Sequence, residues 1–169
     1  MRLEKLVLLT LVSAAIAGCG YRLAARKGDV GTGQTIGVPT FANATTSYRL
    51  EQRMSEAVRK ELARSTHYKV SSTDTGDVVL RGEVLDYNTS PTVLDESGRA
   101  SQYVVSVVMK VSVTERATGK SLFQNNSMVL RDTFQLSPNA GDFVPEDPAA
   151  VERLGNRFAE AVVTALLRR

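Results

Sequence analysis

The sequence contains only one cysteine, Cys19, and only one histidine, His67. A metal centre with cysteine and histidine ligands needs more of both residues, so the composition excludes that type of site. A single cysteine also cannot form a disulfide within the chain, and the folded state must therefore be stabilised by packing. The 21 basic and 18 acidic residues give a formal charge of only +3, which does not indicate a nucleic-acid partner.

The sequence also lacks an apolar run of the length that a comfortable membrane span requires, which is about 20 residues. Its main apolar stretch, residues 6–18, follows Arg2 and Lys5 and ends in small residues. Basic residues, a short apolar run and small residues before a cleavage point are typical of a signal peptide. Residues 1–18 are therefore predicted to be removed, which leaves Cys19 as the first residue of the mature chain.

Residues 16–19, with the sequence Ile-Ala-Gly-Cys, resemble the lipobox of bacterial lipoproteins, in which the cysteine thiol carries a diacylglycerol. The resemblance implies that Cys19 is the lipidation site, with palmitate-type acyl chains that together would hold the protein on a membrane. Gly20 follows where an aspartate would signal retention at the inner membrane, so the resemblance implies the outer membrane. The alternative is that Cys19 merely ends an ordinary signal peptide.

The rest of the chain is predicted to be a linker followed by one domain. Residues 19–34 contain glycines at 28, 31 and 33 and have no helical or strand periodicity, which is typical of a lipidated N-terminus and linker. Residues 35–169 are numerous enough to form a single domain with a sizeable core.

Hydrophobic periodicity predicts the first half of this domain. Residues 35–41 are expected to form a strand that ends near Pro39, and residues 42–47 a turn. Apolar residues at helical spacing predict an amphipathic helix from Tyr48 to about Arg64, with Ser47 as its N-cap.

The middle of the domain is predicted to be β-structure. Residues 68–70 form a short candidate strand, and residues 77–87 alternate with the even positions toward the core. Residues 101–115 alternate most clearly, with apolar odd positions, and the turn signal at 117–120 leads into a returning strand at 121–134. These last two strands are expected at the centre of the sheet. Residues 88–100 are predicted to be a long connection that exposes Val93 and Leu94.

After a predicted loop at residues 136–148, a helix is expected to run to the end of the chain with Asp147 as N-cap and Pro148 as its first residue. The elements together predict an α/β (α+β) fold. We expect a two-layer sandwich in which two helices pack on one face of a mixed, mainly antiparallel four-stranded sheet.

Three segments give the sequence a more specific resemblance. Residues 19–23 (Cys-Gly-Tyr-Arg-Leu), 36–43 (Ile-Gly-Val-Pro-Thr-Phe-Ala-Asn) and 77–84 (Asp-Val-Val-Leu-Arg-Gly-Glu-Val) are together similar to the lipopolysaccharide-assembly lipoprotein family, LptE. The resemblance implies a non-catalytic outer-membrane lipoprotein, facing the periplasm, that plugs an LptD-like β-barrel. In that role it would assist assembly of the barrel and contact lipopolysaccharide (LPS).

Two alternatives remain at this point. Another periplasm-facing accessory lipoprotein, such as an activator of a cell-wall synthase, would need a longer tether than the short segment before residue 35. An enzyme is poorly supported, because no Gly-x-Ser-x-Gly motif occurs and the acidic pairs lie in predicted turns or caps. We therefore predict no catalytic residues, no metal and no cofactor.

Binding of LPS would require cations for the phosphates of lipid A. The candidate residues are Arg81 and Arg131 within strands, Arg99 in the connection after residue 88, and Lys120 in the hairpin turn. Arg81 and Arg131 could share one face if their strands pair suitably. For each of the four residues the alternative is an ordinary solvated surface charge.

Overall fold

The computed structural model describes residues 31–96, 98–135 and 148–168. The predicted signal peptide, Cys19, most of the predicted linker and the predicted loop with Asp147 lie outside the described residues. The strands are β1 (Thr35–Gly37), β2 (Ala42–Asn43), β3 (Lys69–Ser71), β4 (Val78–Leu94), β5 (Ala100–Glu115) and β6 (Ser121–Gln135). The helices of the described part are α2 (Leu50–Ser65) and α3 (Pro148–Leu167).

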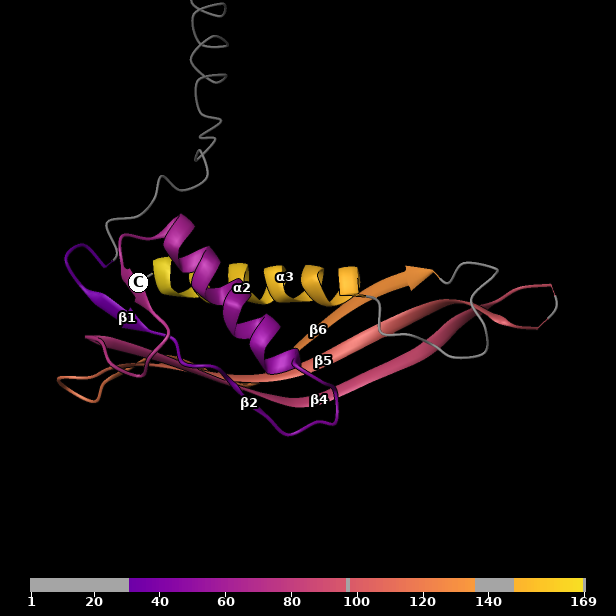
Figure 1. The fold of residues 1–169 in the computed structure, drawn as a ribbon, viewed down its shortest axis with the longest axis horizontal. Helices are drawn as coiled ribbons and strands as arrows, with labels where there is room; N and C mark the ends of the chain where they lie inside the picture. The colour runs from indigo at the N-terminus through magenta and orange to yellow at the C-terminus, as the bar shows by residue number, and fades with distance from the viewer. Residues whose placement is uncertain (1–30, 97, 136–147, 169) are drawn as a thin grey trace, which may run out of the picture.

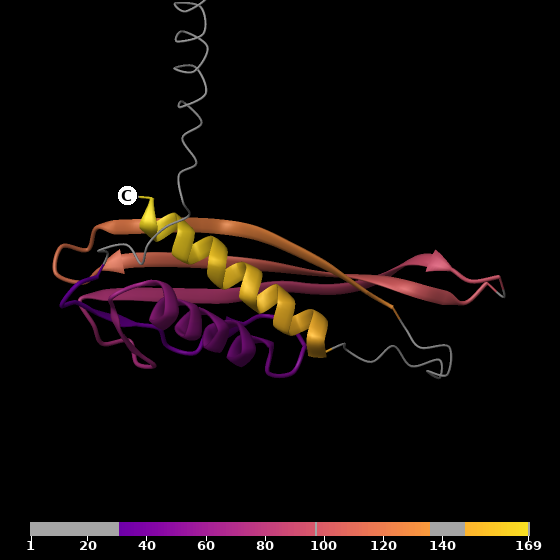
Figure 2. The ribbon, with the colours of Figure 1, turned by 90° about the horizontal axis from the view of Figure 1, so that it is seen from above.

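The described residues form two layers, with α2 and α3 side by side over one face of a single sheet (Figures 1 and 2). The strand order is β3-β1-β4-β5-β6, and β2 pairs with β4 beyond the end of β1. The long strands β4, β5 and β6 are antiparallel, whereas the short strands β1, β2 and β3 make parallel pairs. The predicted two-layer α+β sandwich with a mixed sheet is therefore confirmed.

The sheet has six strands instead of the expected four. One of the two further strands is β3, at the short candidate segment 68–70, which pairs with β1. The other is β2, where Ala42 and Asn43 lie beside Glu83 and Val84 of β4 although they were predicted as part of a turn. A two-residue strand has no periodicity of its own, so its pairing depends on the neighbouring strand. The predicted position of the hairpin also needs correction, because β5 is internal but β6 lies at the edge of the sheet.

The predicted connection at residues 88–100 is largely strand. β4 continues to Leu94 and pairs with the first half of β5, so that Pro91 lies opposite Tyr103. Beyond Val84 no other described strand pairs with the far side of β4. A proline is therefore tolerated at this position, as prolines are at sheet edges in general. The β4–β5 hairpin runs on past both helices (Figure 1), and β6 stays paired with β5 as far as Gln102.

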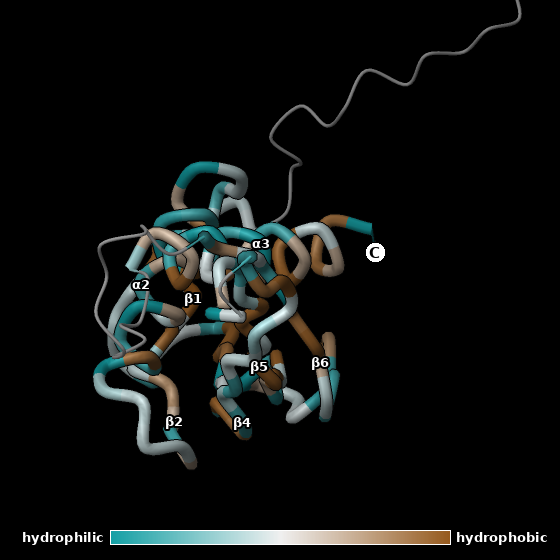
Figure 3. Tube along the Cα trace, turned by 90° about the vertical axis from the view of Figure 1, so that its right-hand side faces the viewer, coloured by the Kyte–Doolittle hydropathy of each residue, from teal (hydrophilic) through white to brown (hydrophobic). Residues whose placement is uncertain are grey.

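Alternation along the strands builds the core as predicted. The odd residues of β5 from Val105 to Val113 are buried against the helices, as are Val78, Leu80 and Val84 of β4. Figure 3 shows the hydrophobic residues concentrated between the sheet and the helices. The two helices approach closely because α3 carries Gly155 at the contact, where an added Cβ would lie 3.3 Å from the Cβ of Ala57.

The start of α2 differs from the prediction. Its N-cap residue is Arg49, in the left-handed region with φ 58°, and no side chain caps the first turn. Ser47 is instead buried, and its carbonyl accepts a hydrogen bond of 2.9 Å from the side-chain amide of Asn43. The same amide donates to the carboxylate of Glu51 at 2.8 Å. This packing holds Ser47 in the turn, and the helix begins three residues later.

Candidate functional site

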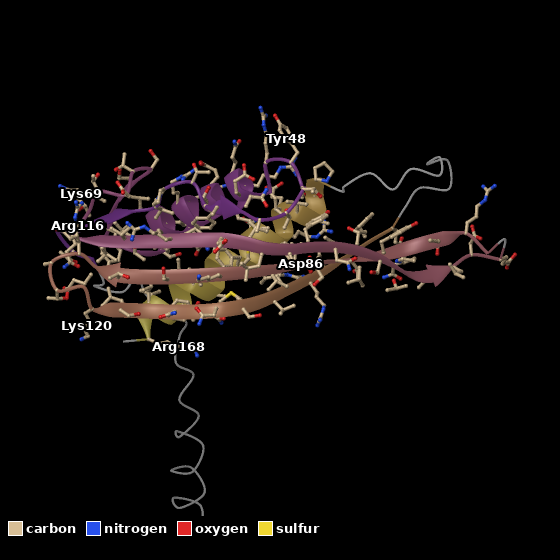
Figure 4. The ribbon with its side chains drawn as sticks, turned by 90° about the horizontal axis from the view of Figure 1, so that it is seen from below. Tyr48, Lys69, Asp86, Arg116, Lys120 and Arg168 are labelled. Carbon is tan, nitrogen blue, oxygen red and sulfur yellow. The ribbon has the colours of Figure 1, made fainter. Side chains whose placement is uncertain are left out.

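The most extensive surface that the helices leave uncovered is the far side of β4, β5 and β6, which we call the open face (Figure 4). It consists of the even residues of β5 and of their partners on the two neighbouring strands. Hydroxyl and amide side chains dominate it at positions such as Ser106, Ser112 and Asn88. Because the odd residues of β5 fill the core, this surface follows directly from the alternation in the sequence.

Apolar residues interrupt the open face near its middle. Val108 lies opposite Val129 of β6, which is 47% exposed, and opposite Asp86 of β4. Leu85, in the irregularity of β4 beside Asp86, is 37% exposed. Exposed branched side chains on a sheet are a common feature of partner contacts when they lie within a polar surround. Val108 indicates this patch in the sequence, because it is apolar at an even position of β5, where the alternation predicts a polar residue.

Arg81 and Arg131 both lie on the open face, because they stand opposite Ser112 and Ser106 of β5. These two serines are separated by six positions on β5, so the two arginines lie about 20 Å apart along the strand direction. The guanidinium of Arg81 also lies 4.0 Å from the carboxylate of Asp74. The two arginines therefore share a face without forming one binding site.

Arg99 has a different setting, at the far tip of the β4–β5 hairpin. The turn is closed by the Asp95 N–H, which donates to the Arg99 carbonyl at 2.7 Å, and by the Asp95 carboxylate, which accepts from the Arg99 N–H at 2.9 Å. Val93 and Leu94, 45% and 63% exposed, precede this turn as predicted. The hairpin tip thus presents one cation close to two exposed apolar side chains.

Lys120 occupies the opposite end of the sheet, in the turn between β5 and β6. Its carbonyl accepts a 2.9 Å hydrogen bond from the Glu115 N–H, and Gly119 has φ 69° in the same turn. The four predicted ligand residues are consequently distributed over three regions of the molecule. The structure brings none of them into contact with another.

The described residues contain no group of three or more His, Cys, Asp or Glu side chains that could hold a metal ion. His67 is exposed. The carboxylate of Asp77 accepts hydrogen bonds from the backbone N–H and the hydroxyl of Thr35. These hydrogen bonds lower the pKa of the Asp77 carboxyl. No helix in the described ranges has the length and apolarity needed to cross a membrane.

The profile of the LptE family, described as lipopolysaccharide-assembly, matches residues 33–169. That match covers the whole of the described domain. The chain belongs to the LptE family. The resemblance drawn from the three short segments is thereby confirmed, and with it the assignment to lipopolysaccharide assembly. No protein in a curated set matches the sequence.

Three solved structures show a similar path of the backbone. Lipoprotein GNA1162 from Neisseria meningitidis is 18% identical, with a TM-score of 0.47 over 80% of this chain and 99% of its own. Rare lipoprotein B from Shewanella oneidensis is 14% identical, with a TM-score of 0.46 over 78% and 93%. The PelC dodecamer from Paraburkholderia phytofirmans is 15% identical, with a TM-score of 0.49 over 87% and 94%. At these scores the likeness carries no functional argument.

Proposed function

We propose that this LptE-family protein is an outer-membrane lipoprotein, acylated at Cys19 and facing the periplasm. In this proposal it sits inside an LptD-like β-barrel, assists the assembly of that barrel and contacts LPS during its transport. The observation that carries the proposal is the family match over residues 33–169. The lipobox-like sequence before Cys19 supports the membrane anchor. The protein acts by binding, in keeping with an accessory family that is not enzymatic.

The open face supports the role of a plug. Three long strands present a surface of small polar side chains with Val108 and Val129 at its centre. Such a surface tolerates water before assembly and can still be covered by a partner, because interfaces between proteins are only moderately apolar. The opposite face of the sheet is already occupied by α2 and α3, so the open face is the side available to a barrel wall.

The hairpin tip supports contact with LPS. Lipid A combines phosphate groups with acyl chains, so a site for it needs a cation next to apolar surface. Arg99 lies near Val93 and Leu94, although it shares the tip with the carboxylates of Asp95 and Glu96, and the Arg81 guanidinium lies 4.0 Å from the carboxylate of Asp74. Among the four predicted residues, we therefore select Arg99 for the exposed apolar side chains beside it, and not for an excess of positive charge.

The proposal is tested by purifying the tagged, acylated protein from native outer membranes in mild detergent and identifying bound proteins by mass spectrometry. Recovery of an LPS-transport barrel in near-equal amount is the expected result. Recovery of a cell-wall synthase would instead support the accessory-lipoprotein alternative. Incorporation of labelled palmitate that is lost after Cys19→Ala substitution would test the anchor separately.

A further inference from the structure

The described chain begins at one end of the sheet, where its first residue, Gly31, packs against Tyr68. Gly31 has φ 84°, and an added Cβ would lie only 2.4 Å from the ring of Tyr68. Its carbonyl accepts from the Gln34 N–H, and the Gln34 carbonyl in turn accepts from the Lys69 N–H, both at 3.0 Å. Residues 31–34 are therefore attached to the start of β3.

Four cationic side chains from separate segments lie toward this same end, as Figure 4 shows. They are Lys69 at the start of β3, Arg116 and Lys120 in the β5–β6 turn, and Arg168 directly after α3. We call these four residues the basic end.

Strand pairing and hydrogen bonds across the ends of the strands place two of these residues, Lys69 and Arg116, on one rim of the sheet. Lys69 is the register partner of Thr35, whose hydroxyl donates to Asp77 at 2.9 Å. The Asp77 carbonyl then accepts from the Arg116 N–H at 2.8 Å. With strands about 4.8 Å apart, Lys69 and Arg116 lie roughly 14 Å from each other on one continuous rim.

The charge of the basic end is not neutralised within the described part of the chain. All four side chains are exposed, and no salt bridge there involves any of them. Of the nearby carboxylates, Asp77 accepts from Thr35 and Glu115 from the hydroxyl of Thr118. Asp74 lines the same cavity as Glu115 and Arg116, and its carboxylate lies 4.0 Å from the guanidinium of Arg81. With Arg81 included, the rim presents five cations and three carboxylates that each already have a partner, which leaves an excess of positive charge.

The distance to the predicted anchor is short. Eleven residues lie between Cys19 and Gly31, so even a fully extended segment of twelve residue steps spans at most about 43 Å. Electrostatic attraction to a charged surface acts within about 8 Å at physiological ionic strength. A chain that leaves from the basic end and enters a membrane nearby brings these cations close to the headgroups, whereas the hairpin tip at the other end points away.

We propose that the basic end lies against the anionic phospholipid headgroups of the membrane leaflet that the lipid anchor enters, and so orients the domain with the hairpin tip away from those headgroups. This inference rests on the proposed acylation of Cys19. It assigns to Lys120, and to Lys69, Arg116 and Arg168, a contact with phospholipid phosphates instead of LPS. Each such cation contributes about fivefold to partitioning onto an anionic surface.

The test uses the acylated full-length mature protein in phospholipid vesicles without LPS. A single cysteine is introduced either near the basic end (Ala117→Cys) or at the hairpin tip (Glu96→Cys), and is labelled with a fluorophore. Nitroxide groups on the lipid headgroups then quench a nearby label. We expect at least fivefold stronger quenching at position 117 than at position 96 in vesicles with about one third phosphatidylglycerol, and little difference in purely zwitterionic vesicles.

Charge reversal supplies the decisive comparison. The variant Lys69→Glu, Arg116→Glu, Lys120→Glu and Arg168→Glu should lose most of the quenching at position 117. A matched control reverses four exposed cations elsewhere, Arg53, Lys60, Arg99 and Arg131, and should keep it. Equal quenching at both labels, or no response to reversal of the basic end, would overturn the inference.

Vesicle flotation separates this result from the proposed anchor. Protein that floats with the vesicles but shows no selective quenching at position 117 contradicts the orientation alone. Protein that does not float contradicts the acylation of Cys19, and the inference is then lost with its premise. Circular dichroism of each variant confirms that charge reversal leaves the fold intact.

Discussion

The ring of Phe41 meets the ring of Phe158 edge to face, with 6.0 Å between the centroids and 87° between the planes. Phe41 lies between β1 and β2, whereas Phe158 belongs to α3, so this contact joins the sheet to the C-terminal helix. Phe41 reaches it by passing over Gly82 of β4, where an added Cβ would lie 2.8 Å from the Phe41 ring. Gly82 therefore provides space on the core face for an aromatic side chain.

Truncation of this contact should strongly destabilise the fold. Phe158→Ala removes a fully buried ring and is expected to lower the free energy of unfolding by about 3–5 kcal/mol. Gly82→Ala should cost about 1–3 kcal/mol, because the new methyl group collides with Phe41. Urea denaturation followed by circular dichroism measures both values. Tyr48→Ala, at a side chain that is 74% exposed, is the control and should change the stability by less than about 0.5 kcal/mol.

Asp132 should be the most important charged residue for the attachment of α3 to the edge of the sheet. Its side chain is only 9% exposed and accepts from the Nε of Arg153, with the Nη2 of Arg157 at 3.4 Å. The two arginines also donate to the carbonyls of Thr133 and Arg131, at 3.2 and 2.9 Å. These carbonyls belong to the edge strand β6, so the arginines occupy acceptors that could otherwise pair with another chain.

We expect Asp132→Ala to lower the free energy of unfolding by about 1–3 kcal/mol, since two guanidinium groups lose a common acceptor. The variant should also aggregate faster, because the β6 edge is less protected. Urea denaturation and light scattering measure the two effects. Asp86→Ala, at an exposed position on the open face, is the matched control, and an equal effect there would contradict the role of Asp132.

The sequence allowed much of this fold to be predicted because long elements carry a clear period. The alternation of β5 and the helical spacing of α3 are each strong enough to identify the element and its buried face. Residues 88–94 were misjudged, because Pro91 and several small polar residues resemble a loop. Their strand conformation is imposed by pairing with β5, and the pattern of a single segment does not contain that information.

The candidate surfaces were less predictable for a related reason. Arg81 and Arg131 were correctly expected to be able to share a face, but their separation along β5 depends on the register of two strand pairs. Val129 could not be identified as exposed before β6 was known to lie at the edge. The proximity of Lys69 to Arg116 depends on the strand order, which local patterns do not determine.

The hydrogen bonds between Thr35 and Asp77 predict a pH dependence. The Thr35 backbone N–H, at 2.7 Å, and its hydroxyl favour the charged form of Asp77 and lower the pKa of this carboxyl. A carboxyl whose pKa is depressed by folding stabilises the fold above its unfolded pKa of about 3.9, and this contribution is lost as the pH falls through the folded pKa.

Between about pH 5 and pH 2, Asp77→Asn should therefore lose less stability than the natural protein does. The urea midpoint, recorded as a function of pH, measures this difference. Thr35→Val removes only the hydroxyl donor and keeps the backbone N–H, so it should flatten the same region of the curve in part. Added to Asp77→Asn, it should flatten the curve no further, since the carboxylate that accepts both hydrogen bonds is already gone. Additive effects of the two substitutions would show that Asp77 is stabilised by another group.

Barrel binding should depend on the apolar centre of the open face. Val129→Asp places a charge at a position that is 47% exposed, so it should leave the stability of the free domain nearly unchanged. In the complex the carboxylate would be buried without a partner, which weakens association by about 2–5 kcal/mol. Co-purification with the barrel should fall at least tenfold. Glu152→Gln, on the helical layer, is the control and should retain the barrel; unchanged binding of Val129→Asp would exclude the open face from the interface.

Binding of LPS should depend on the hairpin tip more than on the strand arginines. Arg99→Glu replaces the cation beside Val93 and Leu94 with a negative charge, which repels the phosphates of lipid A. We expect at least a tenfold loss of affinity in a titration with fluorescent LPS. Leu94→Ser, which removes apolar surface that is 63% exposed, should cost a smaller factor of about three to five. Arg81→Glu together with Arg131→Glu serves as the comparison, because these residues lie about 20 Å apart along the strand direction and neither has the same apolar neighbours. A larger loss from that pair than from Arg99→Glu would place the ligand on the open face instead of at the tip.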